Sequence, residues 1–425
     1  MQTPGSYKPR LIDAAVSAAL SASGAVLIEG PKWCGKTWTG MTHAQSAIWV
    51  SDPTGGYLTR RLAASDPLSL LDGPPPVLID EWQDAPGLWD AVRMAVDRRP
   101  GPGQYLLTGS ATPRDGVVSH SGTGRVARVS MWPMTASEAG LAGGGVSLAG
   151  LLRGDTPMAL PGAWTPKDVT QMIVRGGWPA TIDLPLTDAA RVAADYVRSI
   201  AFTDVTVIDA VRRDPVRVTA LLAALARSTA TVVANTTLTR DMAASDGGMA
   251  STRTVADYVD VLRRLHVLKE IPAWSPALRS PVRLRQRPKR ILCDPSLAAA
   301  AIGASVDGLL ADLKTTGLLF ENLCLRDLSV YAAVSGADVF HYHDESELEA
   351  DAIIQTPDRR WMAIEIKFGA AQEDVAARSL LALSAKMQAA GEQAPAALVV
   401  LTGTGSFAHR RDDGVVVVPF DKLEA

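Results

Sequence analysis

The chain is poor in the features that mark secreted and membrane proteins. Its three cysteines, Cys34, Cys293 and Cys324, are far apart in the sequence and form no C-x-x-C pair. This argues against a disulfide framework and a cysteine-based zinc site, and it is typical of a reducing compartment. No apolar run reaches the roughly 18–20 residues that a membrane helix needs, and residues 1–10 lack the apolar core of a signal peptide. We therefore expect a cytoplasmic protein with no membrane partner.

The overall charge gives no general attraction to nucleic acid or to a membrane surface. Lysine and arginine number 42 against 45 acidic residues, and the formal net charge is -3. Any basic binding site must therefore be local. At 425 residues, of which 47% are hydrophobic, the chain is longer than one hydrophobic core usually serves, so we expect two or three domains.

A phosphate-binding loop is the most informative motif that is present. The pattern G-x-x-x-x-G-K-T is formed by Gly30, Pro31, Lys32, Trp33, Cys34, Gly35, Lys36 and Thr37. A predicted buried strand at residues 25–28 precedes it and a predicted helix follows, which is the context that the motif requires. Backbone N–H groups and the helix N-terminus bind phosphate in such a loop. We predict an ATP site in which Lys36 contacts the β- and γ-phosphates and Thr37 binds Mg²⁺.

Two further predicted strands end in polar residues that fit the same site. The apolar run at residues 77–79 ends in Asp80 and Glu81. We expect Asp80 to hold Mg²⁺ through water and Glu81 to act as the general base for the attacking water. The run at residues 104–108 leads to Thr108 and Ser110, either of which would contact the γ-phosphate or the water. The alternatives are a solvated acidic pair and an ordinary Thr-Gly-Ser turn.

Arg125 and Arg128 follow a loop rich in glycine and serine. An arginine near the phosphates would stabilise charge in the transition state, either in its own chain or from a neighbouring subunit. Solvated arginines on a strand are an equally good interpretation.

The order of the expected elements predicts an α/β fold with three parts. Apolar strands that alternate with helical segments up to residue 155 predict a parallel sheet with helices on both faces. Helix, longer helix and strand at residues 238–244, 251–265 and 267–271 predict a winged-helix-like unit. The predicted domains are residues 1–155, 156–300 and 301–425. Outside the motifs, the expected elements are residues 11–20, 47–50, 189–200, 216–226, 309–330, 373–390, 396–401 and 415–419.

The motifs together resemble one family of proteins. They are Gly30–Thr37, Ile79–Gln83, Leu107–Ser110, Gly124-Arg125 and Pro133-x-x-x-Ser137-Glu138. In this combination the chain resembles, over nearly its whole length, the AAA+-type ATPases of bacteria and archaea that are fused to a C-terminal domain of unknown function with a restriction-endonuclease-like core. The resemblance implies a P-loop NTPase fold, use of ATP and Mg²⁺, and a restriction-endonuclease-like C-terminal domain. Gly122-Thr123 stands where that family typically has a Leu-Ala pair.

The C-terminal part carries an Asp…Glu-x-Lys pattern. Asp351 opens one predicted strand, and Glu365 and Lys367 share one face of the next because side chains alternate along a strand. With Glu321 on the preceding helix, these residues would hold one or two Mg²⁺ ions for phosphodiester hydrolysis, as in the nucleases that the pattern resembles. The alternative is a scaffold in which the same charges form ordinary ion pairs. His341 and His343 are expected beside this centre as strand histidines, because no third metal ligand is evident.

Contact with DNA is the third candidate. The helix predicted at residues 251–265 would expose Arg253, Arg263 and Arg264. A basic run without acids follows, formed by Arg279, Arg283, Arg285, Arg287, Lys289 and Arg290. In a wing these side chains would lie along the phosphate backbone. A solvated edge strand, or a surface that faces the acids near residues 344–349, is an equally good interpretation.

Three functions are therefore consistent with the sequence. The first is an ATP-dependent switch or motor that acts on DNA or on a nucleic-acid-associated partner through the middle and C-terminal domains, as a monomer or a homo-oligomer. The second is an Mg²⁺-dependent nuclease that ATP regulates. The third is a nucleotide-binding scaffold without turnover.

Overall fold

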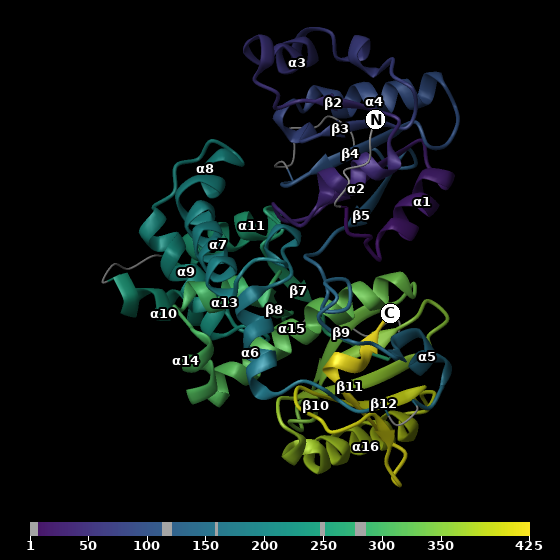
Figure 1. The fold of residues 1–425 in the computed structure, drawn as a ribbon, viewed down its shortest axis with the longest axis vertical. Coiled ribbons are helices and arrows are strands. Elements are labelled where there is room, and N and C mark those ends of the chain that lie inside the picture. The colour runs from purple at the N-terminus through teal and green to yellow at the C-terminus, as the bar shows by residue number, and fades with distance from the viewer. Residues whose placement is uncertain (1–6, 113–120, 158–159, 247–250, 277–285) are drawn as a thin grey trace. The chain divides into compact units, whose positions relative to one another are not determined.

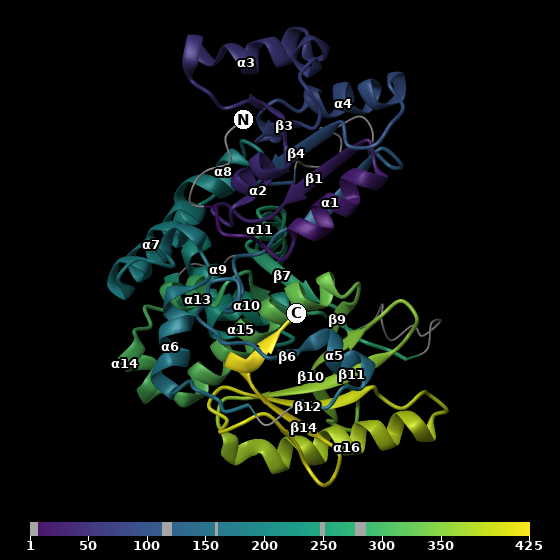
Figure 2. The ribbon, with the colours of Figure 1, turned by 45° about the vertical axis from the view of Figure 1, so that its right-hand side comes forward.

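The computed structural model describes residues 7–112, 121–157, 160–246, 251–276 and 286–425 (Figures 1 and 2). The chain forms two compact units that are not continuous in sequence. The first comprises Met1–Pro133, Thr203–Arg212 and Asp260–Val267, and the second comprises Met134–Phe202, Arg213–Val259 and Leu268–Ala425. The predicted division into three domains remains a prediction. No described helix is both long and apolar enough to cross a membrane.

The first unit is built on a five-stranded parallel sheet. Its strands stand in the order β2-β3-β4-β1-β5, and every neighbouring pair is parallel. Their bounds are β1 Ala25–Glu29, β2 Ser46–Trp49, β3 Val77–Asp80, β4 Tyr105–Gly109 and β5 Val126–Ser130. The carboxyl ends of these strands share one edge of the sheet, so the loops after β1, β3 and β4 are neighbours. The prediction of an α/β fold with a parallel sheet is confirmed.

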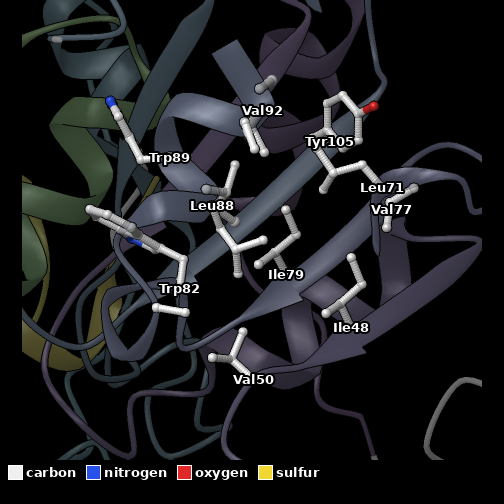
Figure 3. Close-up of a cluster of buried hydrophobic side chains, with 14 of the residues drawn as sticks. Ile48, Val50, Leu71, Val77, Ile79, Trp82, Leu88, Trp89, Val92 and Tyr105 are labelled. Carbon is white, nitrogen blue, oxygen red and sulfur yellow. The ribbon is translucent and has the colours of Figure 1, made fainter. Parts of the chain in front are cut away.

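Helices cover both faces of this sheet because both faces are apolar. Leu27, Ile79 and Leu107 lie in one buried cluster with residues of α4, Gly87–Arg98 (Figure 3). Val26, Leu78 and Leu106, one position away in each strand, lie in a second cluster with residues of α1, Asp13–Ala22. Side chains of a strand alternate between faces, so an uninterrupted apolar run buries both. The other regular helices of this unit are α2 Lys36–His43, α3 Thr54–Ser65 and α8 Val205–Val207.

The N-terminal part of the second unit is mainly helical, as predicted. Its helices are α5 Leu148–Arg153, α6 Pro166–Arg175, α7 Leu186–Ser199, α9 Pro215–Arg227, α10 Asn235–Asp246, α11 Thr252–Arg264, α13 Pro295–Ala301 and α14 Val306–Ala311. The last residues of α11, from Asp260, belong to the first unit. Strand β7, Leu268–Ile271, pairs antiparallel with β8, Lys289–Leu292, and Thr231 forms an isolated antiparallel bridge with Arg290. The winged-helix assignment remains a prediction.

A six-stranded mixed sheet forms the C-terminal part of the second unit. Its order is β13-β14-β12-β11-β10-β9, and the bounds are β9 Asp338–His343, β10 Glu349–Gln355, β11 Trp361–Lys367, β12 Ala397–Thr402, β13 His409–Arg410 and β14 Val416–Pro419. A further short pair joins β6, Val146–Ser147, to β15, Leu423–Glu424. Helix α16, Glu373–Ala389, packs its apolar residues on one side of the large sheet, and α15, Leu313–Val334, lies on the other side in Figures 1 and 2.

The long helix predicted at residues 309–330 is interrupted, which corrects the expectation. Helix α14 ends at Ala311, and α15 begins at Leu313. The side chain of Asp312 accepts a hydrogen bond from the N–H of Thr315, so it caps the second helix. Aspartate favours such a cap over a helix interior because its carboxylate competes for backbone N–H groups.

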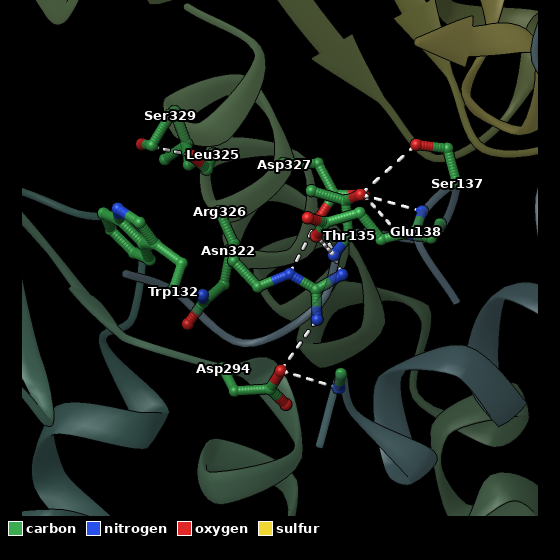
Figure 4. Close-up of polar contacts among 12 residues, drawn as sticks. Trp132, Thr135, Ser137, Glu138, Asp294, Asn322, Leu325, Arg326, Asp327 and Ser329 are labelled. Carbon is green, nitrogen blue, oxygen red and sulfur yellow. Dashed lines mark hydrogen bonds and ion pairs between the residues drawn. The ribbon is translucent and has the colours of Figure 1, made fainter. Parts of the chain in front are cut away.

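A buried charge network holds the chain that follows Pro133 against α15 (Figure 4). Arg326, fully buried, forms ion pairs with Asp294 at 2.7 Å and with Asp327 at 2.6 Å. Asp327 also accepts the backbone N–H of Ala136 at 2.8 Å. The Pro133-x-x-x-Ser137-Glu138 motif therefore begins at the last residue of the first segment of the first unit, and the rest of the motif belongs to the second unit.

Candidate nucleotide site

The phosphate-binding loop has the backbone that its sequence predicts. It joins β1 to α2, and Gly35 adopts a left-handed conformation, φ 105°, at the helix N-cap. Gly30 has no room for a side chain, because a Cβ there would lie 2.2 Å from the carbonyl oxygen of Met131. Glycine is the residue that tolerates both demands. Trp33 is also left-handed, φ 67°, and its side chain is 58% exposed.

Lys36 is folded back over the loop. Its side chain is buried, and the ammonium donates a hydrogen bond to the backbone carbonyl of Pro31 at 2.7 Å. A charged phosphate oxygen is a stronger acceptor for an ammonium than a neutral carbonyl. The loop and Lys36 therefore fit a nucleotide phosphate.

Thr37, Asp80 and Thr108 form a compact group of oxygen atoms next to the loop. The hydroxyl groups of Thr37 and Thr108 donate to the same oxygen of Asp80, at 2.8 and 2.6 Å. Burial raises the pKa of Asp80, and the two hydrogen bonds oppose that shift. Carboxylate and hydroxyl oxygens are the ligands that Mg²⁺ prefers, so this group fits Mg²⁺. Thr108 thus contacts the predicted metal ligand Asp80.

Glu81 is held in place by the strand next to its own. Ser110 donates to a carboxylate oxygen of Glu81 at 3.0 Å, and the amide of Gln83 donates to the same oxygen and to Ser110. The backbone of Glu81 is left-handed, φ 54°, and its N–H donates to the hydroxyl of Thr108 at 3.3 Å. Gln83 was not assigned a role from the sequence, although it lies only two positions after Glu81. Ser110 and Gln83 together orient the carboxylate that the sequence predicts as the base.

Two contacts join the loop region to distant parts of the chain within the first unit. The ammonium of Lys32 lies 2.7 Å from a carboxylate oxygen of Asp204. Arg264, at the end of α11, donates to the carbonyl of Thr112 at 3.1 Å and pairs with Asp209 at 3.2 Å. No sequence pattern signals either contact. Arg264 is largely buried, so the expectation that it is exposed for DNA is wrong.

Arg125 does not lie at the phosphate loop, whereas Arg128 reaches the residue that precedes it. Arg125 precedes β5 and pairs with Asp97 at 2.9 Å, at the end of the sheet where β1 begins. The loop follows the other end of β1, about 16 Å away at the rise of a parallel strand. Arg128 pairs at 3.0 Å with Glu29, the last residue of β1 and the one directly before Gly30 of the loop. This position contradicts a role for Arg125 in its own chain, and action from a neighbouring subunit remains a prediction.

The three residues of the Asp…Glu-x-Lys pattern converge with Glu321 in the second unit. Lys367 lies 2.6 Å from Glu365 and 3.5 Å from Asp351, and Glu321 reaches the same cluster from α15. The sequence predicted this gathering of side chains. It did not predict the fifth member, Lys289 of β8, whose ammonium lies 2.5 Å from Glu321 and 3.5 Å from Asp351.

The five charges of this cluster are largely neutralised by one another. Burial raises the pKa of both Glu321 and Glu365, with the charge of Asp351 as the next cause. Asp351 lies between two ammonium groups, and they outweigh its burial and lower its pKa. Among the described residues there is no group of three histidine, cysteine or acidic side chains that would hold a metal ion.

The prediction that Lys289 and Arg290 belong to an exposed basic surface is wrong. Lys289 is buried among acids, and Arg290 pairs with Glu270 at 3.2 Å. Arg279, Arg283 and Arg285 lie outside the described residues, whereas Arg253 and Arg287 are exposed. His341 and His343 are both residues of β9, as expected; His341 is buried and His343 is partly exposed.

Comparison with protein families divides the chain into three matched stretches. Residues 22–140 match a family model described as an AAA domain. Residues 166–307 and 316–423 match two domains of unknown function, DUF8612 and DUF4143. With the parallel sheet and the loop geometry, the first match supports a P-loop AAA-type ATPase that binds ATP. The restriction-endonuclease-like nature of the C-terminal part remains a prediction.

Similar proteins include two from mycobacteria. The uncharacterized proteins Mb2031c of Mycobacterium bovis and Rv2008c of Mycobacterium tuberculosis are each 24% identical over 95% of this chain and 82% of their own length. Among solved structures, the Walker-type ATPase PABY2304 of Pyrococcus abyssi is 12% identical over 68% of this chain and 94% of its own, with a TM-score of 0.41. The Aeropyrum pernix ORC1 protein, solved in complex with DNA, is 14% identical over 73% of this chain and 96% of its own length, with a TM-score of 0.29.

Proposed function

We propose that this chain hydrolyses ATP at the Gly30–Thr37 loop and uses the reaction to switch its contact with DNA or a nucleic-acid-associated partner. The observation that carries hydrolysis is the arrangement around Glu81. Its carboxylate is fixed by Ser110 and Gln83, one residue after Asp80, which contacts Thr37 of the loop. A nucleotide-binding scaffold has no need for a carboxylate oriented in this way.

Each residue has a role that follows from its position. Lys36 would exchange its bond to the Pro31 carbonyl for phosphate oxygens and stabilise their charge. Thr37 and Asp80 would hold Mg²⁺, which neutralises charge on the phosphates when it is bound. Glu81 would orient the attacking water and accept its proton.

ATP turnover by single-site variants tests this proposal. Lys36→Ala should abolish turnover and weaken ATP binding. Glu81→Gln should keep ATP binding and lower kcat by about 10²–10⁴-fold, the usual contribution of a general base. Glu345→Gln, an exposed acid of the second unit, serves as the matched control and should leave turnover unchanged. Turnover that persists in Lys36→Ala, or ATP binding without turnover in the unaltered protein, would contradict the proposal.

The coupling to a partner is supported by the contacts of Lys32 and Thr112. Lys32 belongs to the phosphate loop, and Asp204, its partner, lies 172 residues away. Thr112 follows β4, which carries Thr108, and it bonds to Arg264 at the end of α11. A change of the loop on nucleotide binding would therefore act on residues 203–212 and on α11.

DNA is the partner that α10, α11, β7 and β8 support best. The Thr231–Arg290 bridge places a short extended segment before two helices and an antiparallel strand pair, which is the order of a winged-helix unit. Arg253, near the start of α11, is exposed. Turnover measured with and without duplex and single-stranded DNA tests this part, and Arg253→Ala should reduce any stimulation. Equal turnover with and without both forms of DNA would contradict the DNA partner while leaving ATP hydrolysis intact.

A further inference from the structure

The acidic cluster of the second unit contains a cation that the chain itself supplies. Glu321 extends from α15, Asp351 from β10 and Glu365 from β11, and Lys289 extends into the cluster from β8. The ammonium of Lys289 lies 2.5 Å from Glu321, 3.5 Å from the Asp351 carboxylate and 3.4 Å from the Asp351 carbonyl oxygen. Three oxygen atoms from two elements therefore surround one ammonium.

Two further carboxylate oxygen atoms of the cluster, one of Asp351 and one of Glu365, also have partners. The second carboxylate oxygen of Asp351 accepts the backbone N–H of Ile366 at 2.8 Å and faces Lys367 at 3.5 Å. Glu365 receives Lys367 at 2.6 Å. A divalent cation needs several oxygen ligands at about 2.0–2.6 Å. Between Glu321 and Asp351 the position for such a cation is taken by Lys289, so the cluster does not fit Mg²⁺.

We propose that Lys289 is the resident cation of this cluster and stands where a nuclease would bind a divalent metal. The C-terminal site is then a metal-free ion network, and cleavage of phosphodiester bonds is not its function. Three carboxyl groups face two ammonium groups, so the network is close to charge balance without any ion from solution. Buried charges persist only when they are paired in this way.

The network also has a structural consequence within the second unit. Lys289 is the first residue of β8, so its ion pairs join the β7–β8 strand pair to the six-stranded sheet. A second connection supports this, because the N–H of Trp274, after β7, donates to the carbonyl of His341 in β9 at 2.7 Å. The β7–β8 strand pair is therefore joined to the six-stranded sheet both by Lys289 and by this backbone hydrogen bond.

Binding of Mn²⁺, followed by electron paramagnetic resonance, tests the proposal. The nucleotide-free Asp80→Asn protein is used so that the ATP site does not contribute. Adding Lys289→Met leaves three carboxyl groups with one ammonium, and this variant should bind one Mn²⁺ at least tenfold more tightly than its parent. A further Asp351→Asn change should remove that binding. Lys386→Met, which breaks the exposed pair with Asp344, is the matched control and should create no site.

If Lys289→Met is poorly stable, two further measurements still test whether Lys289 occupies the metal position. Mn²⁺ should raise the unfolding temperature of Lys289→Met and leave that of Lys386→Met unchanged, because a ligand stabilises only the state that it binds. In the Asp80→Asn parent, which keeps Lys289, adding Asp351→Asn should not alter Mn²⁺ binding. The proposal is overturned if the parent binds Mn²⁺ in a manner that Asp351→Asn abolishes, or if a folded Lys289→Met binds none. This proposal does not depend on ATP hydrolysis, so neither outcome of the Mn²⁺ experiment supports or contradicts the proposed ATPase activity.

Discussion

The ammonium of Lys32 in the phosphate loop lies 2.7 Å from a carboxylate oxygen of Asp204. Asp204 is buried at the end of a short π-helical turn, whereas Lys32 is 42% exposed. The Asp204 carboxylate would therefore compete with nucleotide phosphates for the ammonium of Lys32. The pair therefore links the occupancy of the loop to the segment at residues 203–212.

Removing the charge of Asp204 should release Lys32 to the phosphates. We expect Asp204→Asn to bind ATP about two- to fivefold more tightly, because partly exposed ion pairs contribute only about 0.2–1 kcal/mol. Lys32→Met should bind ATP more weakly than the unaltered protein. Titration with a fluorescent ATP analogue measures both. Asp66→Asn, an exposed acid of the same unit, is the control, and equal weakening by Asp204→Asn and Lys32→Met would show that the pair only supports the loop.

Ser110 and Thr108 should affect different steps although they lie two residues apart. Ser110→Ala removes one hydrogen bond to Glu81 and should lower kcat about fivefold with little change in ATP affinity, because one hydrogen bond contributes about 1 kcal/mol. Thr108→Val removes the bond to Asp80 and should raise the Mg²⁺ concentration needed for half-maximal turnover. Steady-state kinetics over a range of ATP and Mg²⁺ concentrations separates the two effects. An unchanged kcat in Ser110→Ala would argue that Glu81 is not the base.

Arg326→Met should destabilise the second unit strongly. The change leaves the buried carboxylates of Asp294 and Asp327 without their cation, and breaking a buried ion pair typically costs about 3–5 kcal/mol. Arg360→Met breaks a half-exposed pair with Asp358 in the same unit and should cost less than about 1 kcal/mol. Urea denaturation followed by tryptophan fluorescence compares the two variants. Similar costs would contradict the assignment of the Arg326 network as a structural centre.

Acid should weaken the second unit through His341. Burial, and then the charge of Lys289, lower the pKa of His341 to about 4, against about 6.5 in an unfolded chain. Between about pH 6.5 and pH 4, His341 therefore binds a proton in the unfolded state but not in the folded state. This contribution to stability is fully present above about pH 6.5 and is lost as the pH falls toward 4, by at most about 3 kcal/mol.

Replacing His341 tests that assignment. His341→Gln should show a smaller loss of unfolding temperature between pH 7 and pH 4.5 than the unaltered protein. His343→Gln, at a partly exposed position on the same strand, should show the full loss. NMR titration of the unaltered protein should place the pKa of His341 well below 6.5. An unchanged pH dependence in His341→Gln would contradict the prediction.

The sequence alone predicted most of the residues that gather around the phosphate loop. Gly30–Thr37 is contiguous, and the acids of Asp80-Glu81 and the hydroxyl groups of Thr108 and Ser110 each follow a short apolar run. In a parallel sheet the ends of such runs meet at one edge, so knowing the elements is enough to bring these residues together. Strand alternation predicted that Glu365 and Lys367 share one face, and the resemblance to nucleases led to the expectation that Glu321 and Asp351 join them.

Only the tertiary structure decided what the charged side chains do. Lys289 stands in a basic run in the sequence, yet it is buried against Glu321, 32 residues away. Arg264 and Lys32 likewise find partners 55 and 172 residues away. A long charged side chain takes its role from the nearest opposite charge, and packing, not local sequence, brings that charge close. The motifs therefore predicted which residues gather, and packing determined that Asp80 contacts Thr37 of the phosphate loop whereas Glu321 and Asp351 contact Lys289.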